Sequence, residues 1–165
     1  MPEFIFDSCV LSNFALSDGM PVLKRLYAGR AYITNFVRVE IARGIHGGHE
    51  KLAAISRATK DGWLEEITFK TQKENALFEK LSVSLGSGEA SCIAIARSRR
   101  YHFASDDRAA RAEEALLHVK ITGTIGILLR GVKEDVVDIS EGDRLLKRMI
   151  KAGFFSPVTS LRVIK

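Results

Sequence analysis

The stretch Tyr101–Glu114, YHFASDDRAARAEE, sets two aspartates side by side between a short apolar run and a charged, alanine-rich segment. Aspartate is a favoured N-cap because its side chain accepts a hydrogen bond from a free N–H group at the start of a helix. One helix has one N-cap, so capping explains Asp106 or Asp107 but not both. The other carboxylate is a candidate ligand for a cation, and the sequence leaves open which of the two it is.

Two further acids each have an ordinary structural explanation. Asp7 follows the apolar run Phe4–Phe6 and could cap a helix that begins at Ser8. Glu89 lies in the expected first turn of an apolar helix, where the helix dipole stabilises a negative charge by about 0.3–1 kcal/mol. Ser87 could be the N-cap of that helix. Taken singly, neither acid indicates a functional site.

Glu40 is harder to explain by local structure. On a helix with about 100° per residue, it projects between Phe36 and Val37, on the face expected to be buried, while Arg38 points roughly opposite. A buried carboxylate without a partner is costly, so Glu40 requires a cation or a proton. An arginine in a structural ion pair and a metal ion both remain open as that cation.

The elements that must position these acids alternate along the chain. Strands are predicted over residues 3–7, 30–34, 63–69, 101–105 and 119–123. Helices are predicted over residues 8–16, 20–29, 35–44, 51–60, 72–83, 107–117, 124–132 and 140–152, with a helix that is apolar almost all round, and therefore buried, over residues 90–96. This alternation is typical of a parallel sheet covered by helices on both faces. We expect one domain over residues 1–165, with a core of about residues 3–132 and a C-terminal helical extension of about residues 140–165.

The acids gather where such sheets bind ligands, outside the carboxyl ends of the strands. Asp7 and the pair Asp106 and Asp107 each follow a predicted strand. Glu40 and Glu89 lie in predicted helices. Several carboxylates at one end of the sheet would repel one another strongly unless a divalent cation lay among them. All-oxygen ligation with retained waters suits Mg²⁺ or Mn²⁺, so the joint pattern predicts such a site.

Other catalytic patterns find less support. His46 and His49 resemble a ligand pair, but no Cys or further His lies nearby to complete a zinc site. The glycines of LGSGEAS lack the following Lys-Ser/Thr of a phosphate-binding loop. Ser8, Ser105 and Thr124 have no evident histidine partner, which argues against a Ser-His-Asp hydrolase.

Composition bounds the partner and the compartment. The chain has 165 residues, of which 46% are hydrophobic, and only three prolines, which indicates a folded protein. Its formal net charge of +5 is a mild sign of a polyanionic partner. No apolar run approaches the roughly 20 residues that span a bilayer, and no leader sequence opens the chain. With Cys9 and Cys92 expected as small core residues in a reducing environment, we predict a soluble, cytoplasmic protein without a membrane partner.

Five stretches, in this order and spacing, resemble the PIN domain family: FIFDSCVLSNFA, ITNFVRVEIARG, LGSGEASCIAIAR, FASDDRAAR and ITGTIGILLR. They look closest to a branch with a Gly-Glu-Ala helix, an Asp-Asp-Arg stretch and a Thr-Gly-Thr helix start. The resemblance runs from about Ile5 to Arg130, and the tail LLKRMIKAGFFSP is similar to the C-terminus of that branch. It implies a three-layer α/β/α sandwich with a central, mostly parallel sheet and a metal-dependent ribonuclease site.

The resemblance also assigns the site residues. The fourth acid of the family usually follows a Ser or Thr with one residue between, which selects Asp107 after Ser105. The first motif reads Asp-Ser-Cys where Asp-Thr-Ser or Asp-Thr-Asn is more usual, although Ser8 could still supply a hydroxyl. Glu89 stands where many relatives carry aspartate. The implied catalytic and Mg²⁺- or Mn²⁺-binding acids are Asp7, Glu40, Glu89 and Asp107, with Asp106 as neighbour or substitute.

The implied function is an endoribonuclease that hydrolyses RNA phosphodiester bonds. Many relatives are VapC-like toxins of toxin–antitoxin pairs, which work as homodimers and are silenced by a small antitoxin protein. Candidate contacts to the nucleic acid are Ser8, Ser105, Arg108 and Arg111, of which the two arginines lie about one helical turn apart. Two alternatives stay open: a DNA or flap-type nuclease on the same acids, and a non-catalytic PIN-like nucleic-acid-binding subunit.

Overall fold

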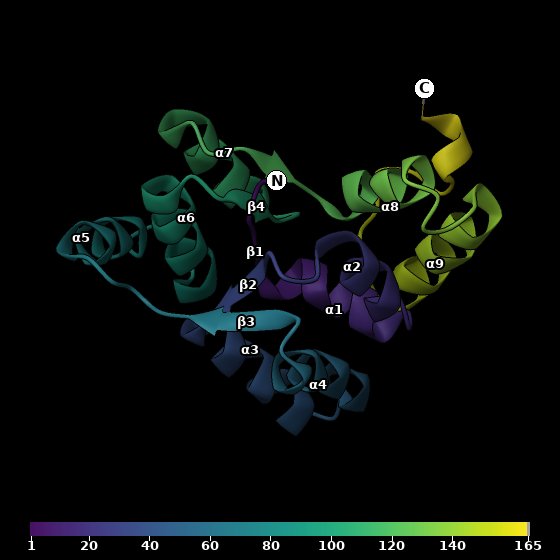
Figure 1. The fold of residues 1–165 in the computed structure, drawn as a ribbon, viewed down its shortest axis with the longest axis horizontal. Coiled ribbons are helices and arrows are strands. Elements are labelled where there is room, and N and C mark those ends of the chain that lie inside the picture. Colours follow the sequence, from purple (N-terminus) through teal and green to yellow (C-terminus); the bar gives the residue numbers. More distant parts are fainter. Residues whose placement is uncertain (165) are drawn as a thin grey trace.

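The computed structural model describes residues 1–164, with the side chains of residues 108 and 114–116 outside the described part. Its sheet has five strands in the order β3-β2-β1-β4-β5, and every neighbouring pair is parallel (Figure 1). The strands are β1 (Phe4–Phe6), β2 (Ala31–Thr34), β3 (Leu64–Ile67), β4 (His102–Ala104) and β5 (Ile121–Thr122). The predicted α/β fold with a parallel sheet is confirmed.

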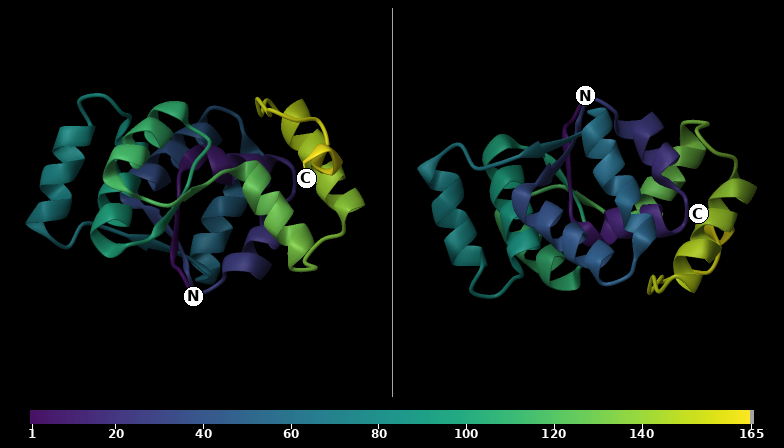
Figure 2. Two further views of the ribbon diagram at one scale, coloured as in Figure 1. Left: turned by 90° about the horizontal axis from the view of Figure 1, so that it is seen from above. Right: turned by 90° about the horizontal axis from the view of Figure 1, so that it is seen from below.

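Helices connect the strands and flank the sheet, as the views in Figures 1 and 2 show. They are α1 (Ser8–Leu16), α2 (Met20–Tyr27), α3 (Asn35–His46), α4 (Ala53–Asp61), α5 (Gln72–Leu81), α6 (Ser87–Arg99), α7 (Arg108–Leu117), α8 (Thr124–Lys133) and α9 (Ile139–Lys151). Short 3-10 turns, η1 (Glu50–Leu52) and η2 (Leu161–Val163), lie before α4 and near the C-terminus. Within residues 1–164, no helix is long and apolar enough to cross a membrane.

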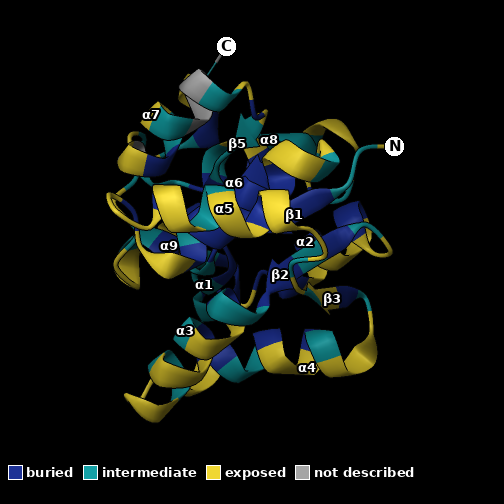
Figure 3. Cartoon of the chain, turned by 90° about the vertical axis from the view of Figure 1, so that its left-hand side faces the viewer, coloured by how far each residue is buried: buried dark blue, intermediate teal, exposed yellow. Residues whose placement is uncertain are grey.

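The central strand of the sheet, β1, is buried on both faces. All three residues of β1 are buried, as expected where helices cover both sides of a parallel sheet. Residues 90–96 of α6 are also all buried, which confirms the predicted apolar helix. Figure 3 shows these segments in dark blue and the outward-facing residues of helices such as α4 and α5 in yellow.

The strand order reverses beside β1. The chain passes from β1 through β2 to β3 on one side, and then returns to β4 on the other side of β1. The segments that leave the carboxyl ends of β1 and β4 therefore diverge, and side chains at these two ends face a common space. In proteins of this fold class, ligands bind at this position.

The predicted end of α3 and the predicted cap of α6 differ from those observed. Thr34 caps α3, since its hydroxyl accepts from the N–H of Val37 at 3.1 Å. The helix does not end at Gly44 but continues to His46. Gly44 is required there for another reason: a Cβ at this position would lie 2.6 Å from Cδ1 of Leu52, so the glycine lets η1 pack closely. Ser87 is the first residue of α6 and not its cap.

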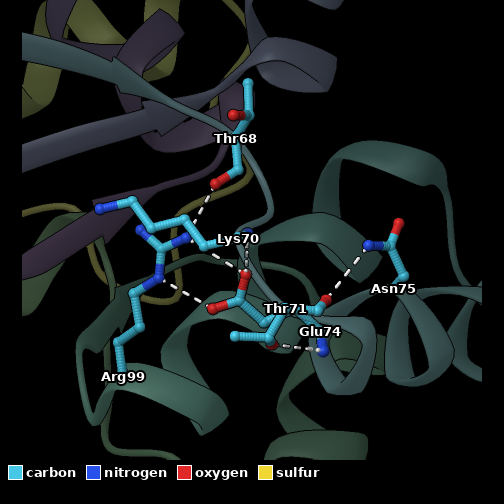
Figure 4. Close-up of polar contacts among 6 residues, drawn as sticks. All are labelled: Thr68, Lys70, Thr71, Glu74, Asn75 and Arg99. Atoms are coloured by element: carbon cyan, nitrogen blue, oxygen red, sulfur yellow. Dashed lines mark hydrogen bonds and ion pairs between the residues drawn. The ribbon is translucent and has the colours of Figure 1, made fainter.

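A buried ion pair joins α5 to α6 and to the segment after β3 (Figure 4). The carboxylate of Glu74, which is 1% exposed, accepts from Arg99 Nε at 2.9 Å and Nη2 at 3.2 Å, and from the backbone N–H of Lys70 at 2.8 Å. Arg99 Nη2 also donates to the carbonyl of Thr68 at 2.8 Å. Thr71 caps α5 by accepting from the N–H of Glu74. Both carboxylate oxygens of Glu74, and Nε and Nη2 of Arg99, have partners within the protein, so the pair is structural.

Candidate functional site

The C-terminal ends of three neighbouring parallel strands, β1, β4 and β5, lie at the same edge of the sheet. Beyond β1, the N–H of Asp7 donates to the carbonyl of Ala104 at 3.0 Å, which continues the pairing with β4. Beyond β4, the N–H of Ser105 donates to the carbonyl of Thr122 at 2.9 Å, which continues the pairing with β5. The regular parallel ladder therefore fixes Asp7 and Ser105 side by side before the chain enters α1 and the turn to α7.

Asp7 is a helix cap with one oxygen left over. Its Oδ1 accepts from the N–H of Val10 at 3.0 Å and from the thiol of Cys9 at 3.0 Å, which makes it the N-cap of α1. Its Oδ2 is buried and has no hydrogen-bond partner among the described residues. Burial, with a smaller contribution from the charge of Asp106, raises the pKa of Asp7 to about 6. The hydrogen bonds from Cys9 and Val10 offset only part of this rise, so the site holds a buried carboxylate whose charge is incompletely compensated.

Cys9 lies beside this carboxylate and is exposed, contrary to the expectation that it is a core residue. Cys92, by contrast, is buried as expected. Although the residue as a whole is exposed, the atoms around its thiol desolvate that group, and together with the charge of Asp7 this holds the pKa of Cys9 well above its ordinary value. The protonated thiol is the donor of the hydrogen bond to Asp7.

Asp107 is the cap of α7, since its Oδ1 accepts from the N–H of Ala110 at 2.9 Å. Its own N–H donates to the hydroxyl of Ser105 at 3.1 Å. Ser105 is buried between β4 and this cap, so it orients Asp107 from the inside. No described group donates to Oδ2 of Asp107, which leaves that oxygen available to a ligand.

Asp106 binds a different helix. Its Oδ1 accepts from the N–H of Thr124 at 2.9 Å, and its Oδ2 accepts from the hydroxyl of Thr124 at 2.5 Å and from Asn13 Nδ2 at 3.3 Å. Thr124 is the first residue of α8. The premise that one helix start leaves one aspartate without a structural partner is therefore wrong, because two helix N-termini meet at this point. The carboxylate with a free oxygen is that of Asp107.

Glu40 reaches the site from α3 but is half-buried, not buried as its helical position suggests. Its Oε2 accepts from the hydroxyl of Ser8 at 2.5 Å. Among the described side chains, no Lys, Arg or His lies within ion-pair distance of it, so the alternative of a structural ion pair is not found. Gly88 makes room for Glu40, because a Cβ there would lie 2.1 Å from its Oε1.

Glu89 lies in the first turn of α6, beside Glu40. Burial raises the pKa of Glu89, and the charges of Glu40 and Asp107 raise it further. Electrostatic interactions therefore connect Asp7 with Asp106, and Glu89 with Glu40 and Asp107.

Of the predicted arginines, Arg111 lies at the site. Its Nη2 donates to the carbonyl of Ser105 at 2.8 Å, and it forms no ion pair with a described carboxylate. Gly123 makes this approach possible, because a Cβ there would lie 2.5 Å from Nη2 of Arg111. The side chain of Arg108 lies outside the described residues.

A cleft of about 970 Å³ opens beside some of these groups, although Asp7 and Glu40 do not line it. Glu89, Asp106 and Asp107 line it together with Arg111. Its other walls come from the start of α8 and from the segment after α9, Gly153–Pro157. The sequence patterns did not single out Asn13 or the segment after α9, although both fall within stretches that carry the family resemblance.

The comparison with known families agrees with this geometry. A family model described as PIN domain matches residues 3–165, which is nearly the whole chain. The chain belongs to the PIN domain family. PIN domains are typically metal-dependent nucleases. No curated protein matches the sequence significantly.

The residues present fit the divalent metal that PIN domains typically use. The unpaired buried oxygen of Asp7 and the raised pKa values of Asp7 and Glu89 both indicate negative charge that a cation would compensate. Within the described part of the chain, no three His, Cys, Asp or Glu side chains are close enough to hold an ion directly. Mg²⁺ retains several waters and needs only one or two direct carboxylates, so this PIN domain suits a hydrated ion.

Substitutions of the two neighbouring aspartates are expected to have unequal effects on stability. Asp106→Ala removes the acceptor for three donors at Thr124 and Asn13 and is expected to lower the free energy of unfolding by about 1–3 kcal/mol. Asp107→Asn keeps a side chain that caps helices equally well, so it is expected to change that free energy by less than about 0.5 kcal/mol. Urea unfolding in EDTA measures both. Equal losses for the two variants would contradict the separate roles.

Proposed function

We propose that this PIN domain is an endoribonuclease that hydrolyses RNA phosphodiester bonds with Mg²⁺ or Mn²⁺. One observation carries the proposal: Asp7 has an unpaired buried carboxylate oxygen, and its carboxyl interacts with the charge of Asp106, which lines the open cleft with Glu89 and Asp107. The acids proposed to surround the hydrated metal, directly or through its waters, are Asp7, Glu89, Asp107 and Glu40, with Asp106 as neighbour. A divalent cation in this site lowers the pKa of water and neutralises charge on phosphate oxygens.

The remaining residues position these groups. Ser8 fixes the carboxylate of Glu40, and Ser105 fixes Asp107 through its backbone N–H. Asp106 holds the start of α8 against the cleft through both groups of Thr124. These three are positioning residues, since each acts through another group.

Arg111 is the described cation best placed to bind a substrate phosphate. One of its five N–H donors is used by the carbonyl of Ser105, and the side chain lines the cleft beside Asp107. Guanidinium groups bind phosphate oxygens through paired hydrogen bonds, so Arg111 would orient the backbone without reading the base. Arg108, one turn away in sequence, is proposed to add a second backbone contact.

The assay compares an RNA oligonucleotide with DNA of matching sequence, each with Mg²⁺, Mn²⁺ or EDTA. We expect cleavage of the RNA that needs the metal and that falls at least roughly 100-fold in Asp107→Asn, because the loss of a metal ligand removes several kcal/mol of transition-state stabilisation. Glu79→Gln, an exposed acid of α5 with no described partner, is the matched control and should keep full activity.

The alternatives predict other outcomes of the same assay. Preferential cleavage of the DNA or of a flap substrate would assign a DNA nuclease to the same acids. Binding of RNA without cleavage under any metal condition would assign a non-catalytic subunit.

We further propose that the protein acts as the toxin of a toxin–antitoxin pair, as a homodimer silenced by a small antitoxin protein. The support is the resemblance to the VapC-like branch of the family. Expression of the chain should then arrest growth, and expression of Asp107→Asn should not. Growth that is arrested equally by both variants would rule out a toxin that acts by cleavage.

A further inference from the structure

The aromatic side chain of Phe155 is exposed to solvent and lines the acidic cleft. Phe155 is 96% exposed and lines the same cleft as Glu89, Asp106 and Asp107. A single exposed apolar residue needs no explanation on its own. Its position does, because the ring is exposed on the one surface where the proposed function requires a polyanion to bind.

The backbone around Phe155 holds the ring outward. Gly153 ends α9 with φ +116°, and the N–H of Phe154 donates to the carbonyl of Met149 at 2.9 Å, as in a Schellman cap. Phe154 packs against the core as the hydrophobic residue of this cap. The N–H of Ser156 donates to the carbonyl of Phe154 at 3.1 Å, which closes a tight turn around Phe155. The ring is therefore presented by an ordered segment and not by a loose tail.

Two kinds of side chain line the cleft. The acids and Arg111 are charged, and a phosphate would bind there through the cation and the guanidinium. Phe154, Phe155, Pro157 and Ile125 are apolar.

A nucleotide of a single strand matches both kinds of lining at once, since it has a charged phosphate and a flat apolar base. Base–aromatic stacking is the usual way in which proteins hold unpaired bases, and every base has a face that can stack. The bases of a duplex are already stacked on their neighbours and paired. A protein partner would instead have to bring cations to the acids and an apolar group to Phe155 within the same opening.

We propose that Phe155 is a base-stacking platform: it stacks on one unpaired base of the substrate next to the phosphate held at the acids, and so selects single-stranded nucleic acid. This subsite rests on the proposed nuclease function.

Binding is measured by fluorescence anisotropy of a short single-stranded RNA with Mg²⁺, in the full chain carrying Asp107→Asn so that the RNA is not cut. Adding Phe155→Ala is expected to weaken binding about 10-fold, within the usual range for one base–aromatic stack. Phe155→Trp should restore the affinity, and Phe155→Leu should not. Val83→Ala is the matched control, because Val83 is 89% exposed but does not line the cleft. The substitutions at Phe155 spare the fold because its side chain is outside the core.

Abasic substitutions identify the base that stacks. Removing the base at one position should weaken binding to the Phe155 protein about 10-fold and should leave binding to Phe155→Ala unchanged. If the unmodified chain cleaves RNA, and the Phe155→Ala protein binds every oligonucleotide, intact or abasic, as tightly as the protein with Phe155 does, the stacking platform is wrong and the nuclease function stands. If the unmodified chain neither binds nor cleaves nucleic acid, both are wrong. Unchanged RNA binding together with a smaller mass in sedimentation for Phe155→Ala would show a protein contact and would also overturn the platform.

Discussion

Replacing Glu74 with glutamine is expected to lower the free energy of unfolding by about 3–5 kcal/mol, because it leaves the guanidinium of Arg99, whose side chain is 14% exposed, without its counter-charge. Glu74 is 1% exposed and accepts hydrogen bonds from Nε and Nη2 of Arg99 and from the N–H of Lys70. Urea unfolding at neutral pH measures the loss. Glu79→Gln, five residues along the same helix and exposed, is the control and should change the free energy by less than about 0.5 kcal/mol.

The same ion pair predicts how the free energy of unfolding depends on pH. Burial raises the pKa of Glu74, but hydrogen bonds from Arg99 and from the N–H of Lys70 outweigh it, so the pKa is lowered from its ordinary value of 4.5. A carboxyl whose pKa is lowered by folding stabilises the protein above its unfolded pKa, and this contribution is lost as pH falls through the folded pKa. The Glu74→Gln variant should therefore lose less stability than the parent chain when pH falls below about 4.5.

A double replacement tests whether the loss of stability comes from the unpaired charge of Arg99. Removing both charges together, as in Glu74→Leu with Arg99→Met, should recover much of the loss, since an apolar pair of similar volume avoids the buried unpaired charge. If Glu74→Gln were as stable as the parent, the pair would carry no weight in holding α5 against α6. Loss of RNA cleavage in a variant that remains folded would place the pair in the site instead.

The sheet and most helices could be predicted because their signals are local. The apolar run Phe4–Phe6 reads as a buried strand, and residues 90–96 are apolar on every side of a helix, so both segments must lie inside. Parallel pairing then follows from the alternation of strands with helices. The family resemblance depends on the same segments, and its match over residues 3–165 confirms it.

Side-chain partners could not be predicted, because they depend on elements far apart in the chain. Helical periodicity predicts that Glu40 is buried and needs a cation. In the structure it is half-buried and accepts a hydrogen bond from Ser8, 32 residues away. The buried ion pair belongs instead to Glu74 and Arg99, which are 25 residues apart. Asp106 likewise binds Thr124 across a strand and a helix, so no pattern within YHFASDDR indicates it.

Asp7→Asn is expected to abolish RNA cleavage and, in EDTA, to stabilise the fold. The pKa of Asp7 is raised from 3.8 to about 6, so the buried charge destabilises the metal-free protein at neutral pH. A shift of about 2 pKa units corresponds to roughly 3 kcal/mol, and asparagine removes the charge while still capping α1 through its carbonyl oxygen. Melting curves in EDTA measure the gain, and the RNA assay measures the loss of cleavage.

The dependence of this gain on pH tests its cause. A carboxyl whose pKa is raised by folding contributes no penalty below its unfolded pKa of 3.8, and the penalty is complete once pH has risen past about 6. Asp7→Asn and the parent should therefore have equal stability near pH 3.8, and the variant should be the more stable above about 6. Excess Mg²⁺ should reduce the difference, because a cation that binds only the folded parent stabilises it. A variant that is less stable than the parent at neutral pH in EDTA, or that still cleaves RNA, would show that Asp7 is a structural carboxylate and that the nuclease site lies elsewhere.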